Sequence, residues 1–313
     1  MSGLSVHLFG RFSAQRDDQV VTGLESQRVQ ALFAYLLLYR NRALSREALA
    51  EVLWGETATG QSRKYLRQAL WQLQGCLDRP EQGSQVGLLV VDPEWIRLDE
   101  GADLWLDVAE LEKAAALTHG IPSDSLPPES VRALQNAVEL YQGNLLESCY
   151  ADWCLFERER LQSMYLAMLD KLMGCCEASH EYETGTLYGE RILRCDRARE
   201  RAHRRLMRLL YLAGDRSAAL RQYERCSAIL EEELGVKPAR STLALYDQIR
   251  NDRLEPTVAQ QEDRTGQAQP AWDAPAWPNL SGDLEQLQKA LREIERSIQQ
   301  GIHLVDRALK EAG

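Results

Sequence analysis

The hydrophobic pattern of the N-terminal third of the chain predicts strands, three helices and a hairpin, in that order. Apolar and polar side chains alternate in short bursts over residues 4–21, which is typical of a small antiparallel sheet. Apolar residues then recur at helical spacing over 26–39, 45–54 and 61–77. Residues 88–99 return to a strand-like composition on either side of a turn, so we expect a closing hairpin.

From residue 103 onward the spacing of apolar residues is helical almost throughout. The predicted helices are 104–117, 129–145, 153–179, 182–195, 199–212, 217–234 and 239–249. Short breaks at His180 and Gly214 lie 34 residues apart, and the dipeptide at 190–191 recurs at 224–225 with the same period. This is the length of a tetratricopeptide repeat (TPR), so the pattern favours a TPR-like, all-α helical-repeat domain.

The C-terminal end of the chain changes character twice. Residues 251–282 contain several prolines among polar residues, which is typical of a flexible linker. Residues 283–313 carry apolar residues spaced three and four apart, with one stutter near Gly301, so we expect an amphipathic helix that forms a coiled coil. Its partner is either a second copy of the chain or the repeat domain of its own chain.

The predicted helix 61–77 separates a leucine stripe from a face of hydrogen-bond donors. No acidic residue lies between Glu56 and Asp78, although the whole chain is acidic. Arg, Lys and Gln are the side chains that reach phosphates and base edges in a DNA major groove. The alternative is an ordinary solvated helix face. The candidate DNA-binding residues of this helix are Arg63, Lys64, Arg67, Gln68, Trp71 and Gln72.

One further candidate lies on the predicted hairpin. Arg97 is on its return strand, near the turn at Pro93. A basic side chain there is placed to meet the DNA backbone across an adjacent minor groove. A solvent-facing strand residue is the equally open alternative.

Charge and composition narrow the class of partner. The 313 residues carry a formal net charge of −10, which argues against a generally basic nucleic-acid coat or a membrane-binding surface. The excess lies after residue 101, and the N-terminal part is nearly neutral. We find no secretory signal pattern and no long apolar run, so we expect a cytoplasmic protein without membrane contact.

Sequence motifs for catalysis are absent. There is no phosphate-binding loop, no dinucleotide fingerprint and no zinc-protease or nucleophile-elbow motif, and the five histidines are far apart in the sequence. The seven cysteines form no Cys-x-x-Cys pair and are expected to be reduced core residues. We therefore expect no enzymatic activity, no catalytic residue, no metal site and no cofactor.

Two stretches carry a family resemblance. The order of strands, three helices and hairpin resembles the OmpR-type winged-helix DNA-binding domain, whose third helix is the recognition helix. The sequences AHRRLMRLLYLAGDRSAALRQYER at 202–225 and EEELGVKP at 231–238 are similar to the bacterial transcriptional activator domain (BTAD). This pair of domains resembles the layout of the Streptomyces antibiotic regulatory protein (SARP) family of bacterial activators. The resemblance implies DNA-binding dimers that recruit RNA polymerase.

The resulting prediction is a mainly α protein with four parts. These are a winged helix (α+β) at 1–101, a BTAD/TPR-like domain at 102–250, the linker at 251–282 and the C-terminal helix at 283–313. The predicted function is a sequence-specific transcriptional regulator of double-stranded DNA, acting as an activator. Two alternatives stay open. One is a helical-repeat scaffold whose winged helix binds DNA weakly or not at all. The other is a switch gated by a peptide or small-molecule effector.

Overall fold

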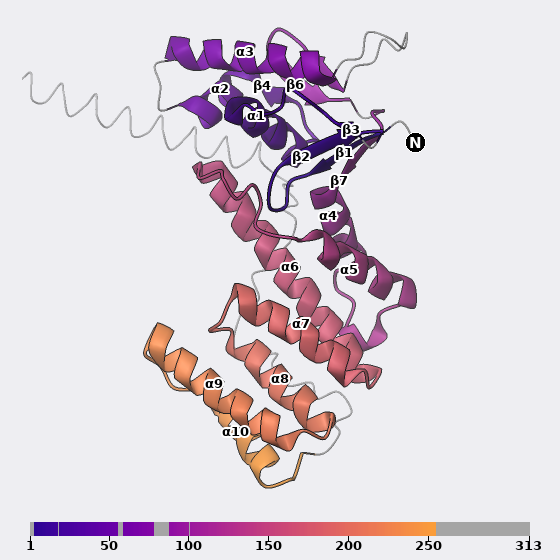
Figure 1. The fold of residues 1–313 in the computed structure, drawn as a ribbon, viewed down its shortest axis with the longest axis vertical. Helices are drawn as coiled ribbons and strands as arrows, with labels where there is room; N and C mark the ends of the chain where they lie inside the picture. Colours follow the sequence, from indigo (N-terminus) through magenta and orange to yellow (C-terminus); the bar gives the residue numbers. More distant parts are fainter. Residues whose placement is uncertain (1–2, 18, 56–58, 78–87, 100, 255–313) are drawn as a thin grey trace, which may run out of the picture. The chain divides into compact units, whose positions relative to one another are not determined.

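The computed structural model describes residues 3–17, 19–55, 59–77, 88–99 and 101–254 (Figure 1). The chain divides into two compact units, Met1–Pro256 and Thr257–Gly313, and every element below belongs to the first. The predicted helix at 283–313, and the predicted linker from residue 255 onward, lie outside the described residues. No helix in the described ranges is long and apolar enough to cross a membrane.

Four strands form the N-terminal sheet, in the order β3-β2-β1-β7. They are β1 (Leu4–His7), β2 (Ser13–Arg16), β3 (Gln19–Val20) and β7 (Leu104–Leu106). β7 pairs parallel to β1 with Leu4 opposite Leu104. The sequence predicted a helix from residue 104, which is wrong for its first three residues. Parallel pairing with a strand about a hundred residues away satisfies their backbone groups, and such a distant partner is invisible to local periodicity.

Three helices and a second sheet complete the winged helix. The elements are α1 (Gln27–Leu38), β4 (Leu44–Ser45), α2 (Arg46–Trp54), α3 (Thr59–Leu77), β5 (Leu89–Val91) and β6 (Trp95–Leu98). β5 and β6 form the predicted antiparallel hairpin, and β4 joins its other edge in the order β4-β6-β5. α3 packs along α1 and α2 (Figure 1). The predicted order of elements is confirmed.

The remaining chain is helical. The helices are α4 (Asp107–Leu117), α5 (Pro128–Leu140), α6 (Asp152–Ala178), α7 (Tyr182–Cys195), α8 (Glu200–Leu212), α9 (Arg216–Leu234) and α10 (Arg240–Arg250), with a short 3-10 turn at Ser123–Ser125. From α6 to α10 each helix packs against the next (Figure 1). His180 and Gly214, both with positive φ, lie in the breaks that follow α6 and α8. The mainly α fold class, with a winged helix before a helical-repeat part, is confirmed.

The predicted helix 129–145 ends five residues early. α5 stops at Leu140, and Leu145 instead forms an isolated antiparallel bridge with Phe9. Backbone bonds fix this connection, from Gly10 N to the Asn144 carbonyl (2.8 Å) and from Leu146 N to the Leu8 carbonyl (2.9 Å). The loop after α5 is therefore held against the end of β1.

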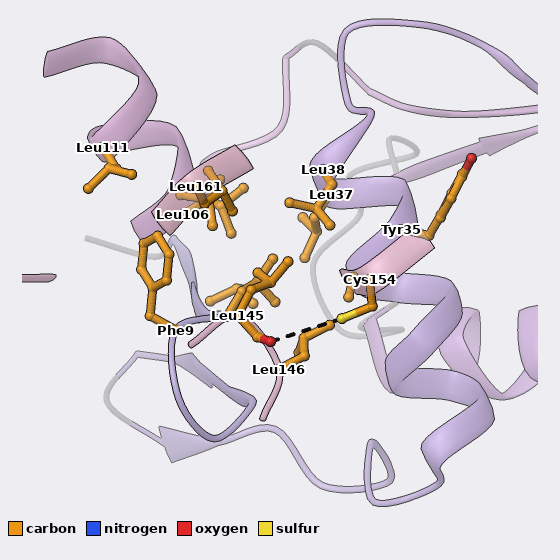
Figure 2. Close-up of a cluster of buried hydrophobic side chains, with 14 of the residues drawn as sticks. Phe9, Tyr35, Leu37, Leu38, Leu106, Leu111, Leu145, Leu146, Cys154 and Leu161 are labelled. Carbon is orange, nitrogen blue, oxygen red and sulfur yellow. Dashed lines mark hydrogen bonds between the residues drawn. The ribbon is translucent and has the colours of Figure 1, made fainter. Parts of the chain in front are cut away.

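One buried hydrophobic cluster runs without interruption from the N-terminal sheet to α8. Figure 2 shows its middle, where Phe9 and Leu37 of the N-terminal part lie close to Leu106, Leu145 and Leu161. A smaller cluster joins α8, α9 and α10 and includes Leu254. The winged helix and the first helices of the repeat part thus share a core.

A buried carboxylate fastens the two parts at the end of β1. The side chain of Asp107, the first residue of α4, is fully buried. Its Oδ2 accepts hydrogen bonds from the backbone N–H groups of Leu8 (2.8 Å) and Phe9 (2.9 Å), and Oδ1 accepts from Val108 N (2.7 Å). Burial raises the pKa of Asp107, and these three donors oppose that rise. Each donor would otherwise be a polar group left in an apolar core.

A second polar connection joins the end of α1 to α4 and α6. Tyr39 Oη donates to Glu157 Oε1 (2.8 Å), and Arg40 Nη2 contacts Glu112 Oε2 (2.6 Å). Arg160 links the two acids, through Nη2 to Glu112 Oε1 (2.7 Å) and through Nε to Glu157 Oε2 (2.8 Å). Burial and the Glu157 carboxylate raise the pKa of Tyr39, which therefore stays a neutral donor.

Candidate nucleic-acid interface

α3 owes its orientation to its leucine stripe. The stripe consists of Leu66, Ala69, Leu70, Leu73 and Leu77, all at most 4% exposed. These side chains recur every three or four residues, so they lie on one side of the helix and pack on α1 and α2. The opposite side is left to solvent because nothing in the described part of the chain covers it.

The structure places the predicted donor residues on that outer side. Lys64, Arg67, Gln68 and Trp71 are exposed, and Gln72 is half-buried. Their spacing brings the first four onto one face of α3. Trp71 is 76% exposed, which leaves a large aromatic ring in water beside two cationic groups. A ring of this size usually gains from burial, so its exposure suits a surface that meets a partner.

Arg63 differs from the other predicted residues because it has a partner within the protein. Its Nη2 forms an ion pair with Glu47 Oε1 on α2. Both side chains are more than half exposed, and exposed ion pairs contribute little to stability. A phosphate would have to compete with the Glu47 carboxylate for this guanidinium.

The beginning of α3 is braced by aromatic contacts that the sequence did not reveal. The guanidinium of Arg28 lies over the ring of Tyr65, 3.7 Å from its centroid. The ring of Tyr65 also meets the ring of Trp54 edge-on, and Tyr65 Oη accepts a hydrogen bond from Gln61 Nε2 (2.5 Å). Arg28 is exposed and adds a cation near the start of α3.

The hairpin presents Arg97 and an unpredicted tryptophan on the same face. Ile96 and Leu98 are buried, whereas Trp95 and Arg97 are exposed, following the alternation of a strand. The W-I-R-L alternation is the signal by which the sequence could have included Trp95. The turn is held by Arg46, whose N–H donates to the Glu94 carbonyl (2.9 Å).

Acidic side chains limit what the hairpin can bind. Asp92 and Glu94 at the turn are exposed. They would repel phosphates unless Arg97 lies nearer to the backbone than they do. The positive charge of this surface therefore lies mainly on α3 and Arg28.

No group of three or more His, Cys, Asp or Glu side chains within the described residues is arranged to hold a metal ion.

Comparison with known proteins agrees with this architecture. Residues 106–250 match the model of the bacterial transcriptional activator domain. The chain is 28% identical to the regulatory protein AfsR of Streptomyces coelicolor, over 86% of this chain and 26% of AfsR. It is 27% identical to the transcriptional regulatory protein MoaR1 of Mycobacterium tuberculosis, over 75% of each protein. The chain spans only about a quarter of the length of AfsR.

A solved structure has the same fold. Mycobacterium tuberculosis EmbR in complex with a low-affinity phosphopeptide superposes with a TM-score of 0.61, covering 81% of this chain and 66% of EmbR, at 21% sequence identity. At that identity the likeness concerns the fold alone. The match of residues 106–250 and the similarity to AfsR and MoaR1 confirm the expected resemblance to SARP-like transcriptional regulators.

Proposed function

Since the chain is SARP-like, with a winged helix followed by a bacterial transcriptional activator domain, we propose that it binds specific DNA sequences and activates transcription. The observation that carries the proposal is the outer face of α3, where Lys64, Arg67, Gln68 and Trp71 lie together on a helix without an acidic residue. An α-helix fits the major groove of B-DNA, and this face supplies donors for it.

Each residue of the interface has a proposed role. Arg67 and Gln68 lie centrally on the outer face and read base edges, with Trp71 and Gln72 beside them. Lys64, and Arg63 once released from Glu47, neutralise phosphates near the start of the helix. Arg97 meets the backbone from the hairpin, next to the exposed ring of Trp95.

Binding to selected DNA tests these roles. A preferred duplex is first selected from a random library, and its affinity is then measured at several salt concentrations. Arg67→Ala should cost about 1–3 kcal/mol and relax the preference at one position, whereas Lys64→Ala should weaken all duplexes alike and reduce the salt slope by about one. The exposed Arg132 on α5 provides the matched control, since Arg132→Ala removes a charge far along the chain from α3. Unchanged affinity and salt slope in the Arg67→Ala/Lys64→Ala double variant would refute the interface and favour the scaffold alternative.

Activation is tested by transcription in vitro with purified RNA polymerase. The template carries the selected duplex upstream of a promoter. We expect more transcript with the wild-type chain than with the Arg67→Ala/Lys64→Ala variant, because recruitment needs the regulator to be bound. A fall below the basal level would instead identify a repressor, and no change would contradict polymerase recruitment.

We further propose that the chain binds DNA as a homodimer through the helix predicted at 283–313. A dimer doubles the phosphate contacts of a nearly neutral winged helix. Sedimentation of the full chain and of a chain ending at Pro256 tests this. The shorter chain keeps Leu254, which is buried in the smaller hydrophobic cluster. Equal masses per particle would reject dimerisation through the C-terminal region.

A further inference from the structure

A cavity of about 490 Å³ opens between α7, α8 and α9. Its rim carries four arginines and a single acidic residue, Glu190. Two of the arginines, Arg194 and Arg197, come from the end of α7 and the turn after it, and Arg221 and Arg225 come from α9. We call this cavity with its four arginines the arginine groove. A concentration of positive charge in a chain of net charge −10 attracts anions selectively to this place.

Among the described residues, three of the four guanidinium groups have no ionic partner. Arg197 pairs with Glu233 Oε1 at 3.3 Å, near the end of α9. Arg194, Arg221 and Arg225 form no ion pair with any residue that the structure describes, and all three are exposed. Some other arginines of the repeat part are paired, as Arg205 is with Asp170 at 2.8 Å. The groove therefore keeps its charge available for a ligand.

The floor of the groove combines apolar side chains with a buried polar pair. Leucines of α7 and α8 and an isoleucine of α9 line it. His203, 1% exposed, uses Nε2 to bond the Arg197 carbonyl (2.8 Å), and its Nδ1 bonds Gln222 Nε2 (2.8 Å). A carbonyl can only accept, so Nε2 carries the proton and Nδ1 accepts from the amide.

This assignment agrees with the electrostatics of the site. Burial lowers the pKa of His203, so the ring is neutral and adds no charge to the groove. The His203–Gln222 pair joins α8 to α9, and the bond from His203 to the Arg197 carbonyl holds the turn that presents Arg197. The walls of the groove are therefore set before any ligand arrives, which reduces the entropy that binding must overcome.

We infer that the arginine groove binds an acidic peptide segment that carries apolar side chains. Carboxylates would meet Arg194 on one wall and Arg221 and Arg225 on the other, while an apolar side chain between them reaches the floor. Duplex DNA is too wide to enter a cavity of this volume. A protein segment can present carboxylates and apolar side chains together, and the inference does not depend on whether α3 binds DNA.

Fluorescence anisotropy of the full chain tests this inference. The probe is a short fluorescein-labelled peptide of repeated glutamate-glutamate-leucine, compared with peptides in which serine replaces leucine or lysine replaces glutamate. We expect saturable binding of the first peptide, weaker binding of the serine peptide and none of the lysine peptide. Free glutamate in excess, which lacks the apolar group and the spacing, should compete poorly.

A matched pair of charge-reversal variants separates the groove from general electrostatics. The Arg221→Glu/Arg225→Glu variant should weaken binding of the glutamate-leucine peptide by about tenfold or more. The control is Arg132→Glu/Arg253→Glu, which changes net charge equally at two exposed arginines outside the groove and should change affinity by less than about twofold. All four arginines are exposed, so both variants should fold, which their circular dichroism checks.

Three results would overturn the inference or one part of it. Equal losses in the two variants would mean that net charge, not the groove, attracts the peptide. Binding of the lysine peptide, or no saturable binding of any peptide, would reject an acidic ligand. Equal affinity for the serine and leucine peptides would reject the role of the apolar floor. Because no DNA is present, failure here leaves the proposed function of α3 untouched, and failure of DNA binding leaves this inference untouched.

Discussion

Replacing Asp107 tests whether one buried carboxylate fastens the N-terminal sheet to the helical part. Asp107→Ala removes the acceptor for the backbone N–H groups of Leu8 and Phe9, and also the bond to Val108 N in the first turn of α4. Leu8 is itself fully buried and Phe9 is 5% exposed, so water cannot easily replace the carboxylate. The N–H groups of Leu8, Phe9 and Val108 are then left unsatisfied in the largest hydrophobic cluster.

The size of the effect follows from these bonds. An unsatisfied buried donor costs about 1–3 kcal/mol, so the three N–H groups of Leu8, Phe9 and Val108 together cost about 3–9 kcal/mol. Loss of a negative charge at the start of a helix adds about 0.3–1 kcal/mol. Asp107→Asn should cost less, about 1–3 kcal/mol, because a single amide oxygen can still accept from both Leu8 and Phe9 and only the bond to Val108 is lost. A domain stability of about 5–15 kcal/mol makes the Asp107→Ala loss large.

Urea unfolding followed by circular dichroism measures these differences, and amide exchange locates them. Asp103→Ala, at an exposed carboxylate four residues earlier, is the control and should stay within about 0.5 kcal/mol of wild type. The amides of Leu8 and Phe9 should lose protection in Asp107→Ala but keep most of it in Asp107→Asn. The reasoning is refuted if Asp107→Ala costs no more than the control, or if Asp107→Asn costs more than Asp107→Ala.

Three further predictions concern reactivity, packing and the hairpin. A hydrogen bond with the neighbouring Cys154 thiol lowers the pKa of Cys149 to about 6, so the rate of Cys149 alkylation by iodoacetamide should rise through pH 6 and level off by pH 7. Burial raises the pKa of Cys195, so its alkylation rate should rise only in alkaline solution. Equal rates for the two cysteines at pH 7 would contradict this prediction. A Cβ at Gly189 would meet Leu206 of α8 at 2.5 Å, so Gly189→Ala should destabilise the fold by about 1–3 kcal/mol. Gly75 on α3 has open space around it, so Gly75→Ala should not destabilise the fold. Thermal unfolding that ranks the two variants the other way would be contrary evidence. Arg97→Ala should shrink the footprint on selected DNA at the groove edge beside the hairpin, and coinciding footprints would remove Arg97 from the interface.

Much of the fold could be predicted from the sequence because the apolar spacing of a helix depends only on residues that are close together in the chain. α7 begins and ends at the predicted residues, Tyr182 and Cys195, and the 34-residue spacing located the breaks at His180 and Gly214. The helical period also separated the buried stripe of α3 from its exposed face, since a side chain's direction on a helix follows from its position alone. For the same reason the sequence could predict that the candidate DNA-binding residues are exposed. Their contact with DNA stays a prediction.

Other features needed partners that are distant in the sequence, and only the tertiary structure decided them. Leu104–Leu106 forms a strand because β1 lies beside it, and α5 ends early because Leu145 bridges Phe9. Arg63 has the pattern of a phosphate ligand, yet it pairs with Glu47, which only the packing of α2 on α3 brings near. The arginine groove likewise exists only where α7, α8 and α9 come together. Local periodicity fixes which side of an element is apolar, but the energy of a particular contact depends on which other element fills the space beside it.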